Sequence, residues 1–308
     1  MSFKNTATKV GAARPRVTGL SLLLVMSFLL MSRPVYAESN ADSNAESATR
    51  ASIQSDIQPE ELATLVNNRV ANEGRTGTMH FVLTNKRGHQ RKRTAQIFHA
   101  DSDDQTNVAI YFTAPSAIED TAFLSLDRTQ TDRDENWLFL PATERVRRLP
   151  ASERGDYFMG TDLTYGDIKD NFKFPAEDWS FGACADSERL KTEQPCLTGE
   201  AVSKKVATEL GYSRFVASID PETWFPSVVR YFDVRDRELK QVEVERQDLI
   251  GGAWTAMAFT LTNLQTKHST EVSFTNMEYR PDLPPIVFAT DSLEFGVPEL
   301  TKLAIHDD

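Results

Sequence analysis

Apolar and polar residues alternate along most of the chain with a period of two. Met79, Phe81 and Leu83 share one side of the segment 77–84, and the polar turn NKRGH follows it. Alternation of this kind places successive side chains on opposite faces of a β-strand. Because a second β-rich segment returns after the turn, residues 77–100 are predicted to form a hairpin.

Short β-rich segments separated by turn residues continue to residue 142 and again from 198 to 279. We expect about ten strands, with no helix of useful length between them. Strands joined by short connections are antiparallel, and a sheet of this size curls because a flat one would leave long open edges. The pattern predicts a mainly β domain, an antiparallel barrel that is either closed or open.

One amphipathic helix is predicted at the start of the folded part. In residues 59–72 four apolar side chains recur at helical spacing and form one stripe. They are Leu62, Leu65, Val66 and Val70. The following sequence EGRTG ends the helix because its two glycines favour a turn.

Some predicted strands are apolar on both faces. Trp137 and Phe139 lie on one face of their strand and Leu138 on the other, and Phe123 likewise opposes Leu124. Such strands need cover on both sides. One side is expected to face a helix or a lid, and the other a packed core or a ligand.

The N-terminus has the pattern of a secretory signal. Four basic residues precede the uncharged run 17–31, and compact residues up to Ala37 follow it. An uncleaved membrane anchor is the alternative, but this run is shorter than the about 20 residues that cross a bilayer. We therefore expect residues 1–37 to be a signal peptide cleaved after Ala37. The polar residues 38–58 are predicted to be a flexible leader, and residues 59–308 a single domain.

The chain is strongly acidic, and export makes it more so. Removal of residues 1–37 takes away five basic residues and no acidic ones, which changes the net charge from −11 to −16. A chain with this charge repels the phosphates of nucleic acids. Nucleic acid is therefore not an expected partner.

The two cysteines, Cys184 and Cys196, are interpreted as a disulfide. An even number of cysteines in an exported chain favours a bridge. Closing so short a loop stabilises a fold by about 3 kcal/mol in the chain-entropy model. A metal pair is the alternative, but no histidine lies near them and two thiolates alone make a weak site.

Groups that could carry catalysis are few. The five histidines are scattered, and each is interpreted as a solvated strand residue: His80, His89, His99, His268 and His306. The sequence contains neither a nucleophile elbow nor a glycine loop for phosphates. The aspartates of 156–170 lack the spacing of a calcium loop and are interpreted as caps of turns and helices. We therefore expect no enzymatic activity, no cofactor and no metal ion.

Two basic clusters stand out in this acidic chain. One is KRGHQRKR at residues 86–93, and the other consists of Arg145, Arg147 and Arg148. Arg145 and Arg147 are two positions apart on a predicted strand, so they share a face. A solvated surface is the simpler interpretation, and a docking patch for an acidic partner or a lipid head group is the alternative.

The stretch WLFLPATERVRRLPASERGDYFMGTDLTYGDI, residues 137–168, resembles a known family. The family pattern is W-L-Y-L-P, then R-V-R-R, then S-F-M-G-[ST]-D-[FL]-[ST]-Y-E-D. It is that of periplasmic outer-membrane lipoprotein-sorting proteins, relatives of the carriers LolA and LolB. The matching residues are Trp137, Leu138, Leu140, Pro141, Arg145, Val146, Arg147, Arg148, Phe158, Met159, Gly160, Asp162, Leu163, Tyr165 and Asp167. Gly166 stands where the family usually has an acid, and a weaker resemblance extends over about 60–295.

The resemblance implies a mainly β fold with a few helices (α+β), an open antiparallel half-barrel of about ten or eleven strands. Helices and loops would cover its concave face and enclose an apolar hollow that takes the acyl chains of a lipid or lipoprotein. The family has no catalytic residues to carry over. The protein is expected to be periplasmic and monomeric, and the resemblance implies that it works with an inner-membrane exporter or an outer-membrane acceptor.

The glycine-rich apolar stretch 155–166 is interpreted as a lid over this hollow. Gly155, Gly160 and Gly166 are its predicted hinges. The predicted ligand-binding residues of cavity wall and lid are Phe123, Trp137, Phe139, Tyr157, Phe158, Met159 and Tyr165. The alternative is that Tyr157, Phe158, Met159 and Tyr165 fill one mouth of the barrel as core.

Three functions are distinguished. The first is a carrier that shields acyl chains in transit, with each buried CH₂ contributing about 0.8 kcal/mol. The second is a filled, cargo-free module that docks on a membrane exporter through Arg145, Arg147 and Arg148. The third is an enzyme acting on lipids or cell-wall material, for which the sequence supplies no converging acid and base.

Overall fold

The computed structural model describes residues 57–102, 105–128, 135–191 and 193–297. The predicted signal peptide and all but the end of the predicted leader lie outside these ranges, as does His306. In chain order the first six strands are β1 (Arg75–Thr84), β2 (Gln90–Ser102), β3 (Gln105–Ala114), β4 (Ala122–Arg128), β5 (Glu135–Leu140) and β6 (Arg145–Leu149). The other seven are β7 (Trp179–Ala183), β8 (Cys196–Ala201), β9 (Arg214–Ile219), β10 (Pro226–Phe232), β11 (Glu238–Ile250), β12 (Ala253–Asn263) and β13 (Ser269–Tyr279).

Helices are short and few in the described part of the chain. The α-helices are α2 (Pro59–Asn67), α3 (Tyr165–Asp170) and α4 (Lys204–Leu210). Single turns of 3-10 helix are η1 (Pro141–Thr143), η2 (Ala151–Glu153), η3 (Phe158–Gly160), η4 (Asp186–Glu188), η5 (Pro285–Phe288) and η6 (Thr290–Glu294). Among the described residues, none of the helices has the length and apolar character needed to cross a membrane.

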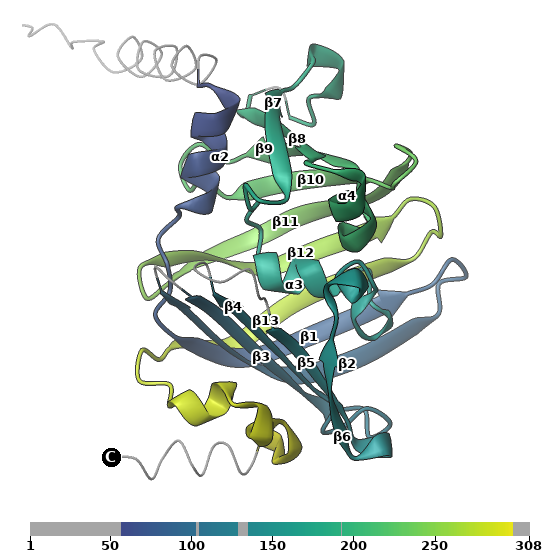
Figure 1. Ribbon diagram of the computed structural model, residues 1–308, viewed down its shortest axis with the longest axis vertical. Coiled ribbons are helices and arrows are strands. Elements are labelled where there is room, and N and C mark those ends of the chain that lie inside the picture. The colour runs from purple at the N-terminus through teal and green to yellow at the C-terminus, as the bar shows by residue number, and fades with distance from the viewer. Residues whose placement is uncertain (1–56, 103–104, 129–134, 192, 298–308) are drawn as a thin grey trace, which may run out of the picture. The chain divides into compact units, whose positions relative to one another are not determined.

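All thirteen strands belong to one antiparallel sheet in the order β6-β5-β4-β3-β2-β1-β13-β12-β11-β10-β9-β8-β7 (Figure 1). Neighbours in the sheet are consecutive in the chain except β1 and β13, which pair at its centre. The chain therefore starts at the centre, runs outward to β6, crosses to β7 at the opposite edge and returns to the centre. This confirms the predicted mainly β, open antiparallel architecture, with two or three strands more than expected.

The alternating pattern of the sequence corresponds to the two faces of the sheet. In β1 every second residue is buried, and Met79, Phe81 and Leu83 lie on the buried side, called here the inner face. β1 and β2 form the predicted hairpin, with Thr84 opposite Gln90. Gly88 in the connecting turn has a φ of +78°, a conformation that glycine adopts without steric cost.

Strands β2 to β5 bury residues on both faces, which the sequence predicted for β4 and β5. On the inner face Phe123 belongs to the main core. On the opposite, outer face Leu124 and Phe139 pack with Val287 of η5 and Leu293 of η6. The C-terminal 3-10 turns therefore provide the second cover that these strands require.

Helix α2 ends five residues earlier than predicted. Leu62 and Val66 are buried, but Val70 lies beyond the helix and is 69% exposed. The last helical residue, Asn67, accepts a hydrogen bond from Phe174 N at 2.7 Å and donates one to its carbonyl at 2.6 Å. This pair of bonds holds the end of the helix to a distant loop, so the apolar stripe stops there.

Residues 198–209, predicted as a strand, divide into the end of β8 and the helix α4. The hydroxyl of Ser203 accepts a hydrogen bond from Val206 N at 3.2 Å and caps the start of α4. Gly211, with a φ of +79°, ends the helix. These two capping residues override the weak alternation of the segment.

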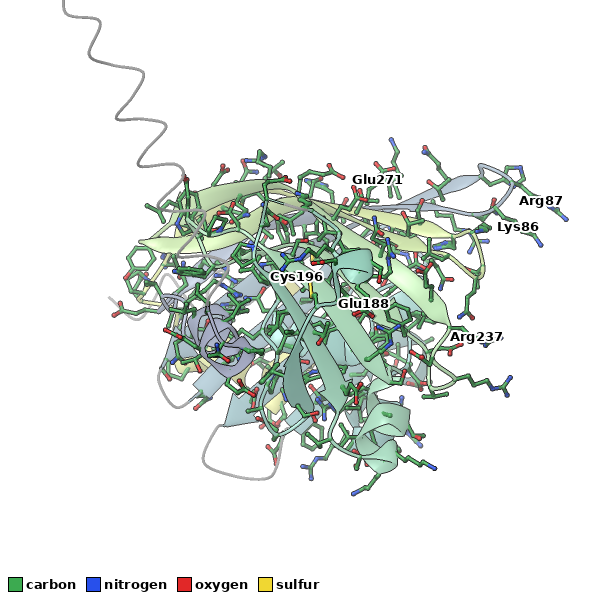
Figure 2. All side chains as sticks on the ribbon, turned by 90° about the horizontal axis from the view of Figure 1, so that it is seen from above. Lys86, Arg87, Glu188, Cys196, Arg237 and Glu271 are labelled. Carbon is green, nitrogen blue, oxygen red and sulfur yellow. A yellow bond between two sulfur atoms is a disulfide. The ribbon has the colours of Figure 1, made fainter. Side chains whose placement is uncertain are left out.

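A disulfide between Cys184 and Cys196 confirms the predicted pairing (Figure 2). It links the end of β7 to the start of β8, the two strands at one edge of the sheet. The bridge therefore closes an edge hairpin that has a neighbouring strand on one side only.

Candidate functional site

The connection between β6 and β7 crosses the sheet from one edge to the other. It comprises residues 150–178, called here the cover segment, and contains η2, η3 and α3. Because β6 and β7 are the two edge strands, this connection has to span the whole width of the sheet. It does so over the inner face, and α3 is seen in front of the central strands in Figure 1.

A cavity lies between the cover segment and the inner face. Its volume is about 90 Å³, counted as the space open to the centres of water-sized spheres. One water needs about 10–15 Å³ on this measure, so the cavity has room for a stretch of chain rather than a single water. Its walls are mostly apolar and include Met79, Ile110, Val242, Phe259, Phe274 and Met277.

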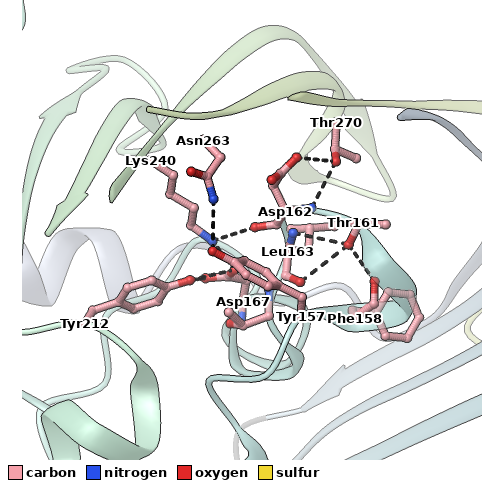
Figure 3. A network of polar contacts seen from close by, with 11 residues as sticks. Tyr157, Phe158, Thr161, Asp162, Leu163, Asp167, Tyr212, Lys240, Asn263 and Thr270 are labelled. Carbon is pink, nitrogen blue, oxygen red and sulfur yellow. Dashed lines mark hydrogen bonds and ion pairs between the residues drawn. The ribbon is translucent and has the colours of Figure 1, made fainter. Parts of the chain in front are cut away.

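A buried ion pair holds the cover segment on the sheet (Figure 3). Asp167 of α3 accepts hydrogen bonds from Lys240 Nζ of β11 at 2.5 Å and from the Tyr212 hydroxyl at 3.1 Å. The fully buried Lys240 also donates to the carbonyl of Asp162 at 2.9 Å. Its Nζ lies 4.9 Å from the ring centroid of Tyr212 and 5.3 Å from that of Tyr231. Removing either partner would leave a buried charge uncompensated, so the pair acts as a clamp.

Asp167 also caps the helix on which it lies. Its carboxylate accepts a hydrogen bond from Thr164 N at 2.6 Å, and the Thr164 hydroxyl accepts one from Asp167 N at 3.1 Å. This reciprocal pair is a capping box. The interpretation of this aspartate as a helix cap is thus confirmed, and one side chain joins local helix formation to the tertiary clamp.

Asp162 attaches the cover segment to β13 and to the turn before it. Its backbone N–H donates to the Thr270 hydroxyl at 2.9 Å, and that hydroxyl donates to Asp162 Oδ2 at 2.7 Å. His268 Nδ1 lies 2.6 Å from the same oxygen. In a catalytic triad the imidazole stands between hydroxyl and carboxylate, whereas here the carboxylate stands between the other two. The described residues also contain no group of three or more His, Cys, Asp or Glu side chains that could hold a metal ion.

Two further arginines hold the cover segment in shape. Arg154 and Asp178, near its two ends, form a buried ion pair with Nη2 and Oδ2 2.5 Å apart. Arg93 of β2 donates to the carbonyl of Met159. The first contact fixes the ends of the segment to each other, and the second fixes its middle to the sheet.

Arg69, just after α2, binds the loop that follows α3. Its Nη2 donates to the carbonyl of Phe172 at 3.1 Å, and its guanidinium lies 4.5 Å from the centroid of the Phe225 ring. Burial lowers the pKa of Arg69 to about 10, and Asp101 opposes this shift. Arg69 is therefore charged at neutral pH, and its charge faces carbonyl dipoles and an aromatic ring.

An aromatic cluster fills the inner face beside β3 and β4. Phe158 of the cover segment is fully buried, with its ring centroid 5.7 Å from Phe112, 5.4 Å from Phe123 and 5.6 Å from Tyr165. Aromatic contacts of this kind add about 0.5–1.5 kcal/mol per pair beyond their burial. This half of the inner face is therefore filled by protein side chains.

The structure places the predicted wall and lid residues in different surroundings. Phe123, Phe158 and Tyr165 meet in the aromatic cluster, and Met159 packs half-buried against the core. Tyr157 is 43% exposed, and its hydroxyl accepts a hydrogen bond from Asn263 at 3.0 Å.

Trp137 and Phe139 pack on the outer face, beneath the C-terminal turns. The cavity described above is lined by other residues. Alternation in the sequence groups Trp137 with Phe139 but does not indicate which face of the sheet will be the inner one.

The three glycines predicted as hinges differ in their geometry. Gly160 has a φ of +73°. At Gly155 an added Cβ would lie 2.8 Å from backbone atoms of Leu210 and Gly211, so this glycine permits the cover segment to touch the end of α4. Gly166 lies within α3, where a Cβ would meet only ordinary contacts.

Apart from the half-buried Arg93, the basic residues of the two clusters lie on the surface. Figure 2 shows Lys86 and Arg87 at the tip of the β1–β2 hairpin, extending away from the rest of the sheet. On edge strand β6, Arg147 bonds Glu153 at 2.9 Å, and Arg148 lies 3.4 Å from Glu135. Exposed pairs of this kind contribute little to stability, but they neutralise part of the positive strip.

One end of the cavity is polar, which the sequence reasoning missed. Arg75 of β1 and His99 of β2 lie opposite each other in the sheet register, and both line the cavity. They are 7% and 2% exposed, so the interpretation of His99 as a solvated strand residue is wrong. Arg75 lies an even number of residues before Met79 and so shares its face. This phase of the alternation indicates a buried Arg75, but residue 75 precedes the predicted hairpin, which begins at residue 77.

Burial sets the protonation of this polar end. It lowers the pKa of His99 to about 3, with the Arg75 charge adding to the shift and Asp101 opposing it. It also lowers the pKa of Arg75 to about 10, again opposed by Asp101. At neutral pH the cavity therefore presents a neutral imidazole beside a charged guanidinium.

Solved structures with this fold include three bacterial proteins. An outer membrane lipoprotein-sorting protein domain from Vibrio parahaemolyticus is 23% identical, with a TM-score of 0.64 over 83% of this chain and 100% of its own. A DUF1329 family protein from Desulfovibrio piger is 21% identical, with a TM-score of 0.67 over 77% and 100%. A LolA superfamily protein from Nitrosomonas europaea is 16% identical, with a TM-score of 0.56 over 76% and 99%. The resemblance to the lipoprotein-sorting proteins is thus confirmed at the level of the fold.

The sequence itself matches one family model. That model carries the description "Uncharacterized protein" and matches residues 104–295, which is more than half of the chain. Among curated proteins none matches.

Proposed function

The chain belongs to the family whose model matches residues 104–295, and from this premise and its LolA-like fold we propose that it is a non-catalytic periplasmic carrier of acyl chains. It takes up the acyl chains of a lipid or lipoprotein beneath the cover segment and shields them from water. It then releases them to an outer-membrane acceptor or works with an inner-membrane exporter. The periplasmic location is supported by the signal peptide predicted at residues 1–37.

The apolar cavity under the cover segment is the observation that carries this proposal. Its walls come mainly from β1, β2, β3, β10, β11, β12 and β13, the strands at and near the centre of the sheet, and from the cover segment itself. Each CH₂ moved from water into such surroundings contributes about 0.8 kcal/mol. Affinity for a chain of many carbons therefore needs no covalent chemistry.

Loading requires the cover segment to move, because a long acyl chain exceeds the volume of the cavity. The segment is attached through polar contacts such as Lys240–Asp167 and Asp162–Thr270. The strands are joined by continuous backbone ladders. Water can replace the side-chain contacts locally while the ladders remain, so opening involves the cover and leaves the sheet intact.

A cavity-filling variant tests the carrier function. Ala256 of β12 lines the cavity and is 7% exposed, so Ala256→Phe places a ring in the space for the acyl chain. Overpacking will cost about 1–3 kcal/mol of stability. We expect native mass spectrometry of protein purified without detergent to detect bound lipid in the wild type and none in the variant.

Ala258→Phe is the matched control, because Ala258 is half-buried on the same strand but is not part of the cavity wall. This control should retain lipid. The carrier function is contradicted if the wild type carries no lipid and also fails to bind a fluorescent fatty-acid probe at micromolar concentration. That result would favour the alternative of a cargo-free module, which the filled aromatic half of the inner face and the exposed Arg145 on β6 support.

A further inference from the structure

We propose that the polar end of the cavity binds the anionic head group of an amphiphile whose acyl chain occupies the apolar part. The inference rests on the proposed function and narrows the ligand to a class, a long alkyl chain that ends in a carboxylate or a phosphate. Arg75 and His99 are the residues that hold the head group. A cargo anchored only by its acyl chains would not require either of them.

Arg75 has donors available for such a ligand. A guanidinium carries five N–H donors, and the hydrogen bond that the described structure shows for this side chain is a long one, 3.5 Å from Nη1 to the Thr255 hydroxyl. Thr255 itself lines the cavity. A planar cation with free donors is suited to bind a carboxylate or phosphate through two parallel hydrogen bonds.

His99 is an unpartnered polar side chain at the same place. Within the described residues neither Nδ1 nor Nε2 has a hydrogen-bond partner, although the ring is 2% exposed and forms part of the cavity wall. Leaving a buried polar group unsatisfied costs about 1–3 kcal/mol. A ligand atom that accepts a hydrogen bond from the imidazole N–H removes this cost. Binding of a ligand with its polar group beside His99 is therefore favoured.

The charges near the polar end leave a net positive site. Asp101 is the nearby carboxylate, and it accepts from Thr106 and lies 3.8 Å from Lys173 Nζ. Lys173 lines the cavity together with Arg75. The carboxylate of Asp101 thus faces two cations, Arg75 and Lys173. Arg69 lies close by and is a third positive charge.

The two carboxylates that line the cavity itself are each close to a lysine. Asp167 bonds Lys240 at 2.5 Å, and Asp170 lies 3.7 Å from Lys169. Neither carboxylate neutralises Arg75. An anionic head group would therefore meet a net positive charge at the polar end, where Arg75 and Lys173 outnumber Asp101, and its chain would meet the apolar wall around Phe259.

A series of ligands with one chain and different head groups tests the proposal. The exported protein, freed of bound lipid, is titrated with palmitate and hexadecyl phosphate below their critical micelle concentrations and with hexadecanol below its solubility limit. We expect palmitate or hexadecyl phosphate, or both, to bind about 10- to 100-fold more tightly than hexadecanol, as for a hydrogen bond to a charged group. Preference for one anion over the other identifies a fatty acid or a phosphate as the physiological head group.

Arg75→Met is the direct variant, because it keeps an apolar stem but removes the charge. We expect it to reduce the affinity for the anions to that for hexadecanol while the affinity for hexadecanol itself changes by less than about threefold. Arg91→Met, at an exposed arginine of β2, is the control and should bind as the wild type does. If Arg75→Met fails to fold, the wild-type ligand series decides alone.

The outcomes separate this inference from the proposed function. Equal affinities for palmitate, hexadecyl phosphate and hexadecanol would overturn the head-group site and leave the carrier in place. An absence of binding by all three would contradict the carrier itself. Tight anion binding that Arg75→Met leaves unchanged would also overturn the assignment to Arg75.

Discussion

Two buried titratable residues at the cavity have pKa values that are shifted in opposite directions. Burial lowers the pKa of His99 from 6.5 to about 3, aided by Arg75 and Lys173 and opposed by Asp101. Burial raises the pKa of Asp170 from 3.8 to about 6, opposed mainly by Lys169. Below pH 6.5 the unfolded chain takes up a proton at His99 that the folded chain does not. The contribution of His99 to the free energy of unfolding therefore decreases as the pH is lowered. Between pH 6 and 3.8 the folded chain holds a proton at Asp170 that the unfolded chain lacks, so stability rises as pH falls.

Variants at the two positions should therefore differ in their pH profiles. Relative to the wild type, His99→Gln removes the acid-induced loss, and its free energy of unfolding should rise as the pH falls from 6.5 to 4. Asp170→Asn removes the acid-induced gain, and its free energy of unfolding should fall over the same range. Urea unfolding at each pH measures both. Parallel profiles for the three proteins would show that neither residue titrates differently in the folded and unfolded chains.

At the scale of elements, the hairpin of β7 and β8 forms one edge of the sheet. β7 has one neighbouring strand, and the contacts of α2 with β7 and β8 provide its other cover. Cys184 and Cys196 join the two strands at a sequence separation of 12 residues. The bridge stabilises the hairpin mainly because it restricts the unfolded chain.

Replacement of both cysteines by serine should lower the free energy of unfolding by about 3 kcal/mol, as expected for a loop of this length. Chemical denaturation measures the change, and the wild type under reducing conditions is the matched control because its sequence is unchanged. Both should show the same destabilisation. A double variant as stable as the oxidised wild type would mean that the packing of the hairpin suffices without the bridge.

At the scale of the whole described domain, strand order determines where the site lies. The sheet has its first and last strands at the centre and its sixth and seventh at the edges. The β6–β7 connection must therefore cross the inner face. A short turn of the kind that joins neighbouring strands could not span this distance. The polar clamp at Lys240 and Asp167 then determines how firmly this connection covers the cavity.

Lys240→Ala should destabilise the protein by about 3 kcal/mol, because Asp167 would lose its partner in buried surroundings. We also expect Lys240→Ala to accelerate hydrogen exchange, relative to the wild type, more in residues 161–171 than in the strands, because the clamp holds the cover segment. Lys205→Ala is the control: Lys205 is exposed and pairs with Glu209 on α4, so its loss should cost less than about 0.5 kcal/mol. Equal effects of the two variants would contradict the clamp.

Much of the architecture could be predicted from periodicity and capping. The alternation through Met79, Phe81 and Leu83 predicted a strand and its buried face, and the two cysteines of an exported chain predicted their bridge. The errors were also local. Val70 continued an apolar stripe past the end of its helix, and the caps Ser203 and Gly211 were overlooked.

The sequence by itself determined which side chains share a face of each strand, where the chain turns, and that the fold resembles lipoprotein-sorting proteins. Only the tertiary structure decided that Trp137 faces outward and that Phe158 fills one half of the inner face. It also decided that Arg75 meets His99 at the cavity. The physical reason is that alternation along a strand is a local property and is the same for either face. The choice of the inner face depends on contacts between segments that are far apart in the chain.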